Sequence, residues 1–117
     1  MRFSVAKTKY TILIPLSYND GTQVPDAERN EIYNRFYALA NGYTLAGTVV
    51  GAYRSKDGSK QVDSSTAIWV AIDEDKESAL RRLVAEICTR LRQETIYLER
   101  TGETVDFIQP LGSGDEP

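Results

Sequence analysis

The side chains of this chain that could carry out chemistry are carboxylates and tyrosines, because the sequence contains no histidine. Without histidine there is no usual general base, no Ser-His or Cys-His nucleophile pair and no histidine ligand for zinc or iron. The single cysteine, Cys88, lies on an apolar helical stripe, where a thiol is usually inert. We therefore expect no catalytic cysteine, no disulfide within the chain, no metal site and no cofactor.

Aromatic and amide side chains on the predicted strands are the best candidates for a ligand site. Tyrosine and tryptophan combine apolar area with a polar tip, and an amide next to a carboxylate offers fixed polar contacts. The predicted ligand-binding residues are Tyr53, Trp69, Gln93, Glu94 and Tyr97. If the protein is an enzyme, its acid–base groups would be these two tyrosines with Asp63, Glu94 and Glu99, since a carboxylate with a raised pKa can act as a base.

Three consecutive acids, Asp73, Glu74 and Asp75, precede the second predicted helix. Carboxylate oxygens suit magnesium or calcium, but the spacing of a known cation-binding loop is absent. An aspartate can also cap a helix, and acids in a first turn complement the positive end of the helix dipole. We predict that these acids cap the helix.

The stretch 66–91 positions several of these residues, because it combines a strand, the acidic turn and an amphipathic helix. Alternation along the strand puts Thr66, Ile68, Val70 and Ile72 on one face and Trp69 on the other. The helix carries one apolar stripe at a 3.6-residue period, formed by Leu80, Leu83, Val84, Ile87, Cys88 and Leu91. The first strand face should therefore contact the helices, and Trp69 should mark a second contact surface.

The remaining pattern predicts strands over about 9–18, 43–54, 61–72, 95–100 and 103–108, and a first helix over about 25–41. Pro15 indicates an edge, a bulge or the end of the first strand, because proline donates no ladder hydrogen bond. Gly42 should take the left-handed conformation that ends the first helix.

Two glycines four residues apart, Gly47 and Gly51, lie on one face of the second strand. They could form the floor of a shallow pocket with Tyr43 and Tyr53 at its rim. They could equally mark strong twist or a groove that accepts side chains of a packed helix.

The order strand, helix, strand, strand, helix, strand predicts an α+β fold of the ferredoxin-like kind. This is a βαββαβ antiparallel sheet with both helices on one face, here with a possible extra C-terminal strand. Right-handed crossovers place the first and third strands in the middle of the sheet. We expect one domain over residues 1–111 and a flexible tail over 112–117.

Composition narrows the classes of partner. The chain has 117 residues and a net charge of −3, which argues against nucleic acid because phosphate binding requires a basic patch. No apolar run is long enough to span a membrane. A single cysteine is compatible with a reducing compartment, and we expect a cytoplasmic location.

Several short motifs occur in a fixed order between about Tyr10 and Ile108. They are Asp20-Gly21, Phe36, Gly42-Tyr43-Thr44, Gly51-Ala52-Tyr53, Asp57-Gly58, Ser65 and Gln93-Glu94. This order resembles a family of small bacterial proteins known only as a domain of unknown function. The resemblance implies a fold and a bacterial or phage origin, and it implies no mechanism.

We predict from these features a small, non-enzymatic module that binds a small molecule or a protein partner. One face of the predicted sheet is uncovered and carries Trp69, and an apolar open face usually means association. We therefore expect a homodimer. The alternative is a small ferredoxin-like enzyme that uses carboxylate and tyrosine chemistry without histidine or metal.

Overall fold

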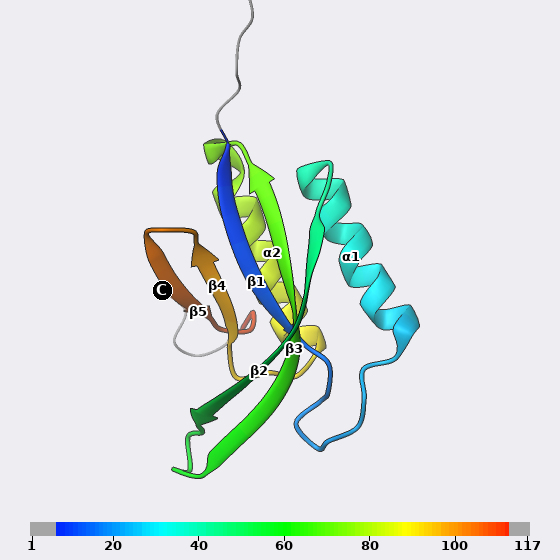
Figure 1. Ribbon diagram of the computed structural model, residues 1–117, viewed down its shortest axis with the longest axis vertical. Coiled ribbons are helices and arrows are strands. Elements are labelled where there is room, and N and C mark those ends of the chain that lie inside the picture. Colours follow the sequence, from blue (N-terminus) through cyan, green and yellow to red (C-terminus); the bar gives the residue numbers. More distant parts are fainter. Residues whose placement is uncertain (1–6, 113–117) are drawn as a thin grey trace, which may run out of the picture.

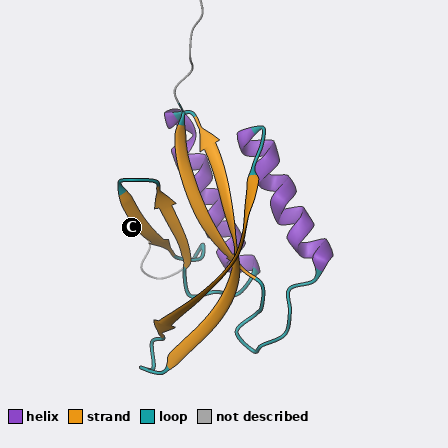
Figure 2. Ribbon diagram, viewed as in Figure 1, coloured by secondary structure: helices purple, strands orange, loops and turns teal. Residues whose placement is uncertain are grey.

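The computed structural model describes residues 7–112 as a five-stranded antiparallel sheet with two helices packed against it (Figures 1 and 2). The elements in chain order are β1 (Thr8–Pro15), α1 (Asp26–Ala40), β2 (Thr44–Arg54), β3 (Lys60–Ile72), a 3₁₀ turn (Glu74–Lys76), α2 (Glu77–Arg90), β4 (Ile96–Arg100) and β5 (Thr104–Ile108). The α+β class and the positions of the elements are therefore confirmed to within a few residues. Residues 113–117 of the predicted tail lie outside the described part of the chain.

The strands lie in the order β2-β3-β1-β4-β5, and every pair of neighbours is antiparallel. The prediction that the first and third strands occupy the middle is confirmed. Pro15 is the last residue of the central strand β1, where it lies opposite Ser65. Beyond it, the Leu16 N–H donates to the Ser64 carbonyl at 3.0 Å. Proline thus sits where the regular strand ends, which is one of its three predicted positions.

The core lies between the helices and one face of the sheet. Ile68, Val70 and Ile72 of β3 are buried there, as their alternation predicted. They pack in one cluster with β1, with Ile32 and Phe36 of α1 and with the apolar stripe of α2. Burial of each large aliphatic side chain contributes about 1.5–3 kcal/mol relative to exposure. These contacts hold both helices against the sheet.

The structure differs from the predictions at the C-terminal end of α1 and at the N-terminal cap that precedes α2. The left-handed residue after α1 is Asn41, with φ of 62°, and its N–H donates to the Tyr37 carbonyl. The prediction for Gly42 was wrong because asparagine also tolerates this conformation and comes one residue earlier. Asp73 forms no side-chain cap, since its carboxylate accepts a hydrogen bond from Lys7 Nζ at 3.0 Å.

Among residues 7–112, no helix is both long and apolar enough to cross a membrane.

Candidate functional site

The outer part of the β2–β3 hairpin projects past the rest of the sheet (Figure 1). Its loop is held by Asp57, whose Oδ1 accepts hydrogen bonds from the Ser55 hydroxyl at 2.6 Å and the Ser59 N–H at 2.9 Å. These bonds lower the pKa of the Asp57 carboxyl to about 2. The loop therefore closes the hairpin firmly and keeps the two strands in register.

The projecting hairpin carries Tyr53 and Asp63 on one face, because Tyr53 lies opposite Gln61 and Asp63 comes two residues after Gln61 on β3. The Glu94 carboxylate, in the loop between α2 and β4, acts on the Tyr53 hydroxyl by its charge. We call Tyr53, Asp63 and Glu94 the cluster. Burial raises the pKa of the Tyr53 hydroxyl, and the charge and hydrogen bond of Asp63 and the charge of Glu94 raise it further. The phenol is therefore protonated at neutral pH, and its O–H can act as a hydrogen-bond donor on this face of the hairpin.

The cluster is open, and no lysine or arginine among residues 7–112 forms an ion pair with its carboxylates. Gly51 lies opposite Asp63 in the β2–β3 ladder, and nothing lies within 4 Å of the place where its Cβ would be. A cation that entered the space above Gly51 would meet unneutralised negative charge.

Gln93 fixes the loop that presents Glu94. The Gln93 side chain is buried, and its Nε2 donates to the Leu91 carbonyl at 3.0 Å. The Gln93 N–H donates to the Cys88 carbonyl at 3.0 Å, and the Cys88 thiol donates back to the Gln93 carbonyl at 3.3 Å. The structure thus gives the predicted ligand residue Gln93 a positioning role, and the exposed Glu94 follows it directly in the chain.

Trp69 lies apart from this cluster. It is eight positions along β3 from Gln61, the ladder partner of Tyr53, which corresponds to about 26 Å of strand at 3.3 Å per residue. The indole is 40% exposed, and Lys9 Nζ lies 3.6 Å from the centroid of its ring. Trp69 therefore belongs to the open face of the sheet near β1.

Tyr97 is also separate, because β4 lies on the opposite side of β1 from β3. Its hydroxyl donates to Glu99 Oε1 at 3.1 Å, and its ring packs edge-on against Phe107 with centroids 5.9 Å apart. Burial and then the Glu99 carboxylate raise the pKa of the Tyr97 hydroxyl. Of the five predicted residues, only Tyr53 and Glu94 influence one another, through the charge of Glu94, and Gln93 holds the loop that carries Glu94.

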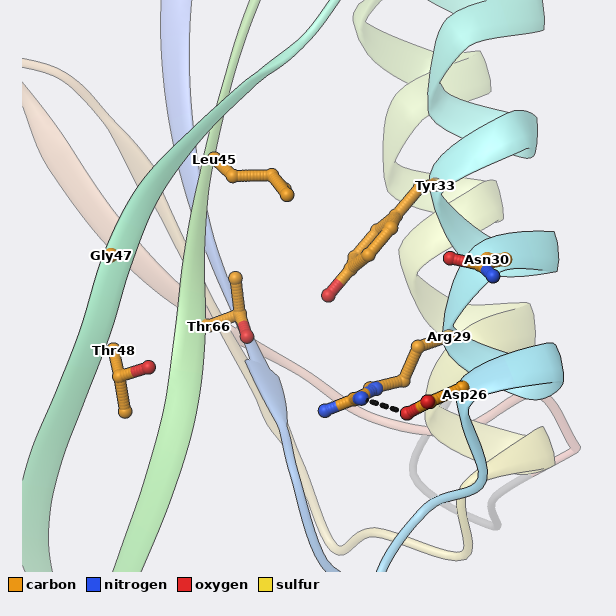
Figure 3. A pocket seen from close by; sticks show the side chains of 8 residues that line it. All are labelled: Asp26, Arg29, Asn30, Tyr33, Leu45, Gly47, Thr48 and Thr66. Carbon is orange, nitrogen blue, oxygen red and sulfur yellow. Dashed lines mark hydrogen bonds and ion pairs between the residues drawn. The ribbon is translucent and has the colours of Figure 1, made fainter.

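A groove of about 470 Å³ lies between α1 and the strands β2 and β3 (Figure 3). Its lining side chains come from both sides: Asp26, Arg29, Asn30, Tyr33, Leu45, Gly47, Thr48 and Thr66. The groove forms beside a β-bulge between Leu45 and Gly47, where Gly47 has φ of 112°. Sequence reasoning found only the glycine, because the helix side of the groove carries no local signal.

The two glycines of β2 therefore differ in role. Gly47 lines the groove, whereas Gly51 lies outside it and faces Asp63 across the ladder. The predicted rim is also different, since the Tyr43 ring packs on the Tyr33 ring with centroids 5.8 Å apart and Tyr53 belongs to the other cluster.

No family model and no curated protein matches this sequence. Two solved structures share its fold over almost the whole length. One is a phage SAM lyase in complex with S-methyl-5'-thioadenosine, with a TM-score of 0.69, 15% identity and 97% coverage of each chain. The other is a phage SAM lyase in the apo state, with a TM-score of 0.64, 13% identity and coverage of 97% of this chain and 98% of that chain. At these identities the similarity shows the fold.

The prediction of a non-enzymatic binding module is contradicted, because both of these solved structures with this fold are of a phage SAM lyase. Of the two predictions, the alternative of a small ferredoxin-like enzyme agrees better with these neighbours. The sequence could not decide between them, since the same sheet and helices serve for binding and for catalysis.

Proposed function

We propose that this chain is an enzyme, a lyase that acts on S-adenosylmethionine and releases 5'-methylthioadenosine. The observation that carries the proposal is the cluster of Tyr53, Asp63 and Glu94, whose carboxylates lack a cationic partner among residues 7–112. The likeness to phage SAM lyase over 97% of both chains supports the same substrate class.

Charge complementarity links the cluster to this substrate. A sulfonium group is a permanent cation, and a carboxylate about 4 Å away would attract it by roughly 4 kcal/mol at an effective dielectric constant of 20. The Tyr53 ring adds a cation–π contact of about 0.5–2 kcal/mol. Both attractions weaken when the C–S bond breaks, because the sulfur becomes neutral. These two attractions therefore contribute to substrate binding. The acceleration of C–S bond cleavage must come from orientation of the substrate or from proton transfer.

In the proposed reaction the sulfur keeps the electron pair of the C–S bond and leaves as a neutral thioether. The carbon that it leaves gains a bond from within the substrate. Either the substrate's own carboxylate oxygen attacks and closes a lactone, or Asp63 or Glu94 removes a proton from the adjacent carbon and its electrons form a C=C bond. Neither route consumes water, and the two differ in product.

The test is to incubate the purified protein with S-adenosylmethionine and to measure products by liquid chromatography and mass spectrometry. We expect 5'-methylthioadenosine together with either the lactone or the alkene. Asp63→Asn and Glu94→Gln should lower the rate, by about 10²-fold or more for whichever group acts as a base. Glu99→Gln is the matched control, because Glu99 lies outside the cluster and accepts a hydrogen bond from the Tyr97 hydroxyl. Thioether formation no faster than without protein would refute the proposal.

We further propose that the chain pairs with a second copy through the open sheet face. Three large apolar residues support this, since Trp69, Val49 and Phe107 are exposed in the single chain. In native mass spectrometry, Trp69→Glu should change the mass from that of a homodimer to that of a monomer. Tyr37→Glu, at an exposed position of α1, should leave the homodimer intact. A wild-type monomer, or an unchanged mass for Trp69→Glu, would contradict this pairing.

The strand order β2-β3-β1-β4-β5 supports a ferredoxin-like arrangement in which β5 is an addition at one edge. The cytoplasmic location and the membership of the bacterial domain family stay predictions.

A further inference from the structure

We propose that the groove between α1 and β2 binds a free α-amino acid by its carboxylate and ammonium groups. This inference goes beyond the proposed lyase reaction and does not depend on it. Thr48 and Thr66, which line the groove, are neighbours in the β2–β3 ladder. Strand alternation puts them on the face opposite to Tyr53 and Asp63. The groove is therefore a separate site.

The charged end of the groove is formed by Asp26 and Arg29, which pair through Asp26 Oδ1 and Arg29 Nη2. Their environments differ, because the Asp26 side chain is 85% exposed and that of Arg29 only 29%. Figure 3 shows the guanidinium reaching from α1 toward Thr66, with the Asp26 carboxylate beside it. A guanidinium has five N–H donors, so most remain available to a second carboxylate in bidentate geometry.

The other end of the groove is apolar. Leu45 extends from β2 toward the Tyr33 ring, as Figure 3 shows. The Tyr33 ring also packs against the ring of Tyr43, whose centroid lies 5.8 Å away at an interplanar angle of 32°. An unbranched or flat side chain can therefore lie between Leu45 and Tyr33. The volume of about 470 Å³ is ample for an amino acid of the size of methionine or phenylalanine.

A zwitterion fits this combination better than other small ligands. A simple anion would gain from Arg29 but would be repelled by Asp26 directly beside it. A neutral nucleoside would have no use for the adjacent opposite charges. In an α-amino acid the carboxylate and the ammonium sit on one carbon, so Arg29 can hold the first while Asp26 holds the second. The Asn30 amide and the Thr66 hydroxyl provide further partners at that end.

The β-bulge explains why the groove exists. An extra residue in β2 between Leu45 and Gly47 bends the strand and increases its twist. Gly47 adopts φ of 112°, a conformation that residues with a Cβ rarely take. The two residues that flank the bulge, Leu45 and Gly47, both line the groove.

The test is a titration of the full chain with L-methionine and L-phenylalanine, followed by ¹H–¹⁵N NMR spectra. We expect saturable shifts at residues of the groove, and a loss of affinity of about ten-fold or more in Arg29→Gln and in Asp26→Asn. Arg35→Gln is the matched control on the same helix, because Arg35 pairs with Glu86 and does not line the groove. The methyl ester of methionine lacks the free carboxylate. It should bind the wild-type protein no more tightly than L-methionine binds the Arg29→Gln variant.

Three results would overturn the inference: no saturable shift with either amino acid, equal affinity in Arg29→Gln and wild type, or equal affinity for the ester and the free acid. Binding of 5'-methylthioadenosine in the groove with no binding of L-methionine would also overturn it, and would assign the groove to a nucleoside. The titration contains no S-adenosylmethionine, so its failure is distinct from failure of the lyase assay.

Discussion

The substitution Glu77→Gln tests whether the ionic network between α2, β1 and β4 stabilises the fold. Glu77 accepts hydrogen bonds from Arg81 Nε at 3.0 Å and from Arg100 Nη1 at 3.1 Å. Its side chain is only 26% exposed, and Tyr10, on the neighbouring strand β1, is buried. The Tyr10 hydroxyl, followed by the Arg81 and Arg100 guanidinium groups, lowers the pKa of the Glu77 carboxyl below its ordinary value of 4.5.

The magnitude follows from the number of charged hydrogen bonds. A hydrogen bond to a charged group contributes about 1.5–3 kcal/mol, and a neutral one about 1 kcal/mol. Glutamine keeps the shape and one acceptor but loses the charge at two arginines. The expected loss is therefore about 2 kcal/mol of unfolding free energy, or about 8 °C in Tm for a chain of this size.

The assay is urea unfolding at pH 7 and at pH 3, with Glu74→Gln as the matched control. Glu74 lies 3.5 Å from Arg100 but is 78% exposed, so its loss should change little. Because the folded pKa of Glu77 is lowered, its contribution is fully present above about pH 4.5 and disappears as the pH falls through the folded pKa. A loss under about 0.5 kcal/mol at pH 7, or an equal difference at both pH values, would refute this reasoning.

Two further predictions concern the core. Burial raises the pKa of the Cys88 thiol to about 11. A thiol reagent such as DTNB should therefore label Cys88 in the native protein only at the rate of unfolding. Fast labelling that is independent of urea would contradict the buried position. Phe36→Ala should cost about 3–5 kcal/mol in urea unfolding because Phe36 is fully buried, whereas Tyr37→Ala, next to it and exposed, should cost much less. Similar losses for the two variants would mean that α1 packs by a different face.

The alternation and periodicity of apolar residues determined the local elements and their buried faces. Ile68, Val70 and Ile72 could be assigned to the core because side chains alternate along a strand. The central place of β1 and β3 could be derived because crossover connections are right-handed. Cys88 could be judged inert because it shares its helical stripe with leucine and isoleucine.

Only the tertiary structure decided which distant polar groups meet. Asp73 pairs with Lys7 across 66 positions rather than capping the adjacent turn, and the charge of Glu94 raises the pKa of Tyr53 from a different part of the chain. The groove likewise needs a bulge at Gly47 and the side chain of Arg29 brought opposite it by packing of α1. Periodicity reports which face of an element is buried, whereas contacts between charges depend on how whole elements are placed, and that placement is set by the packed core.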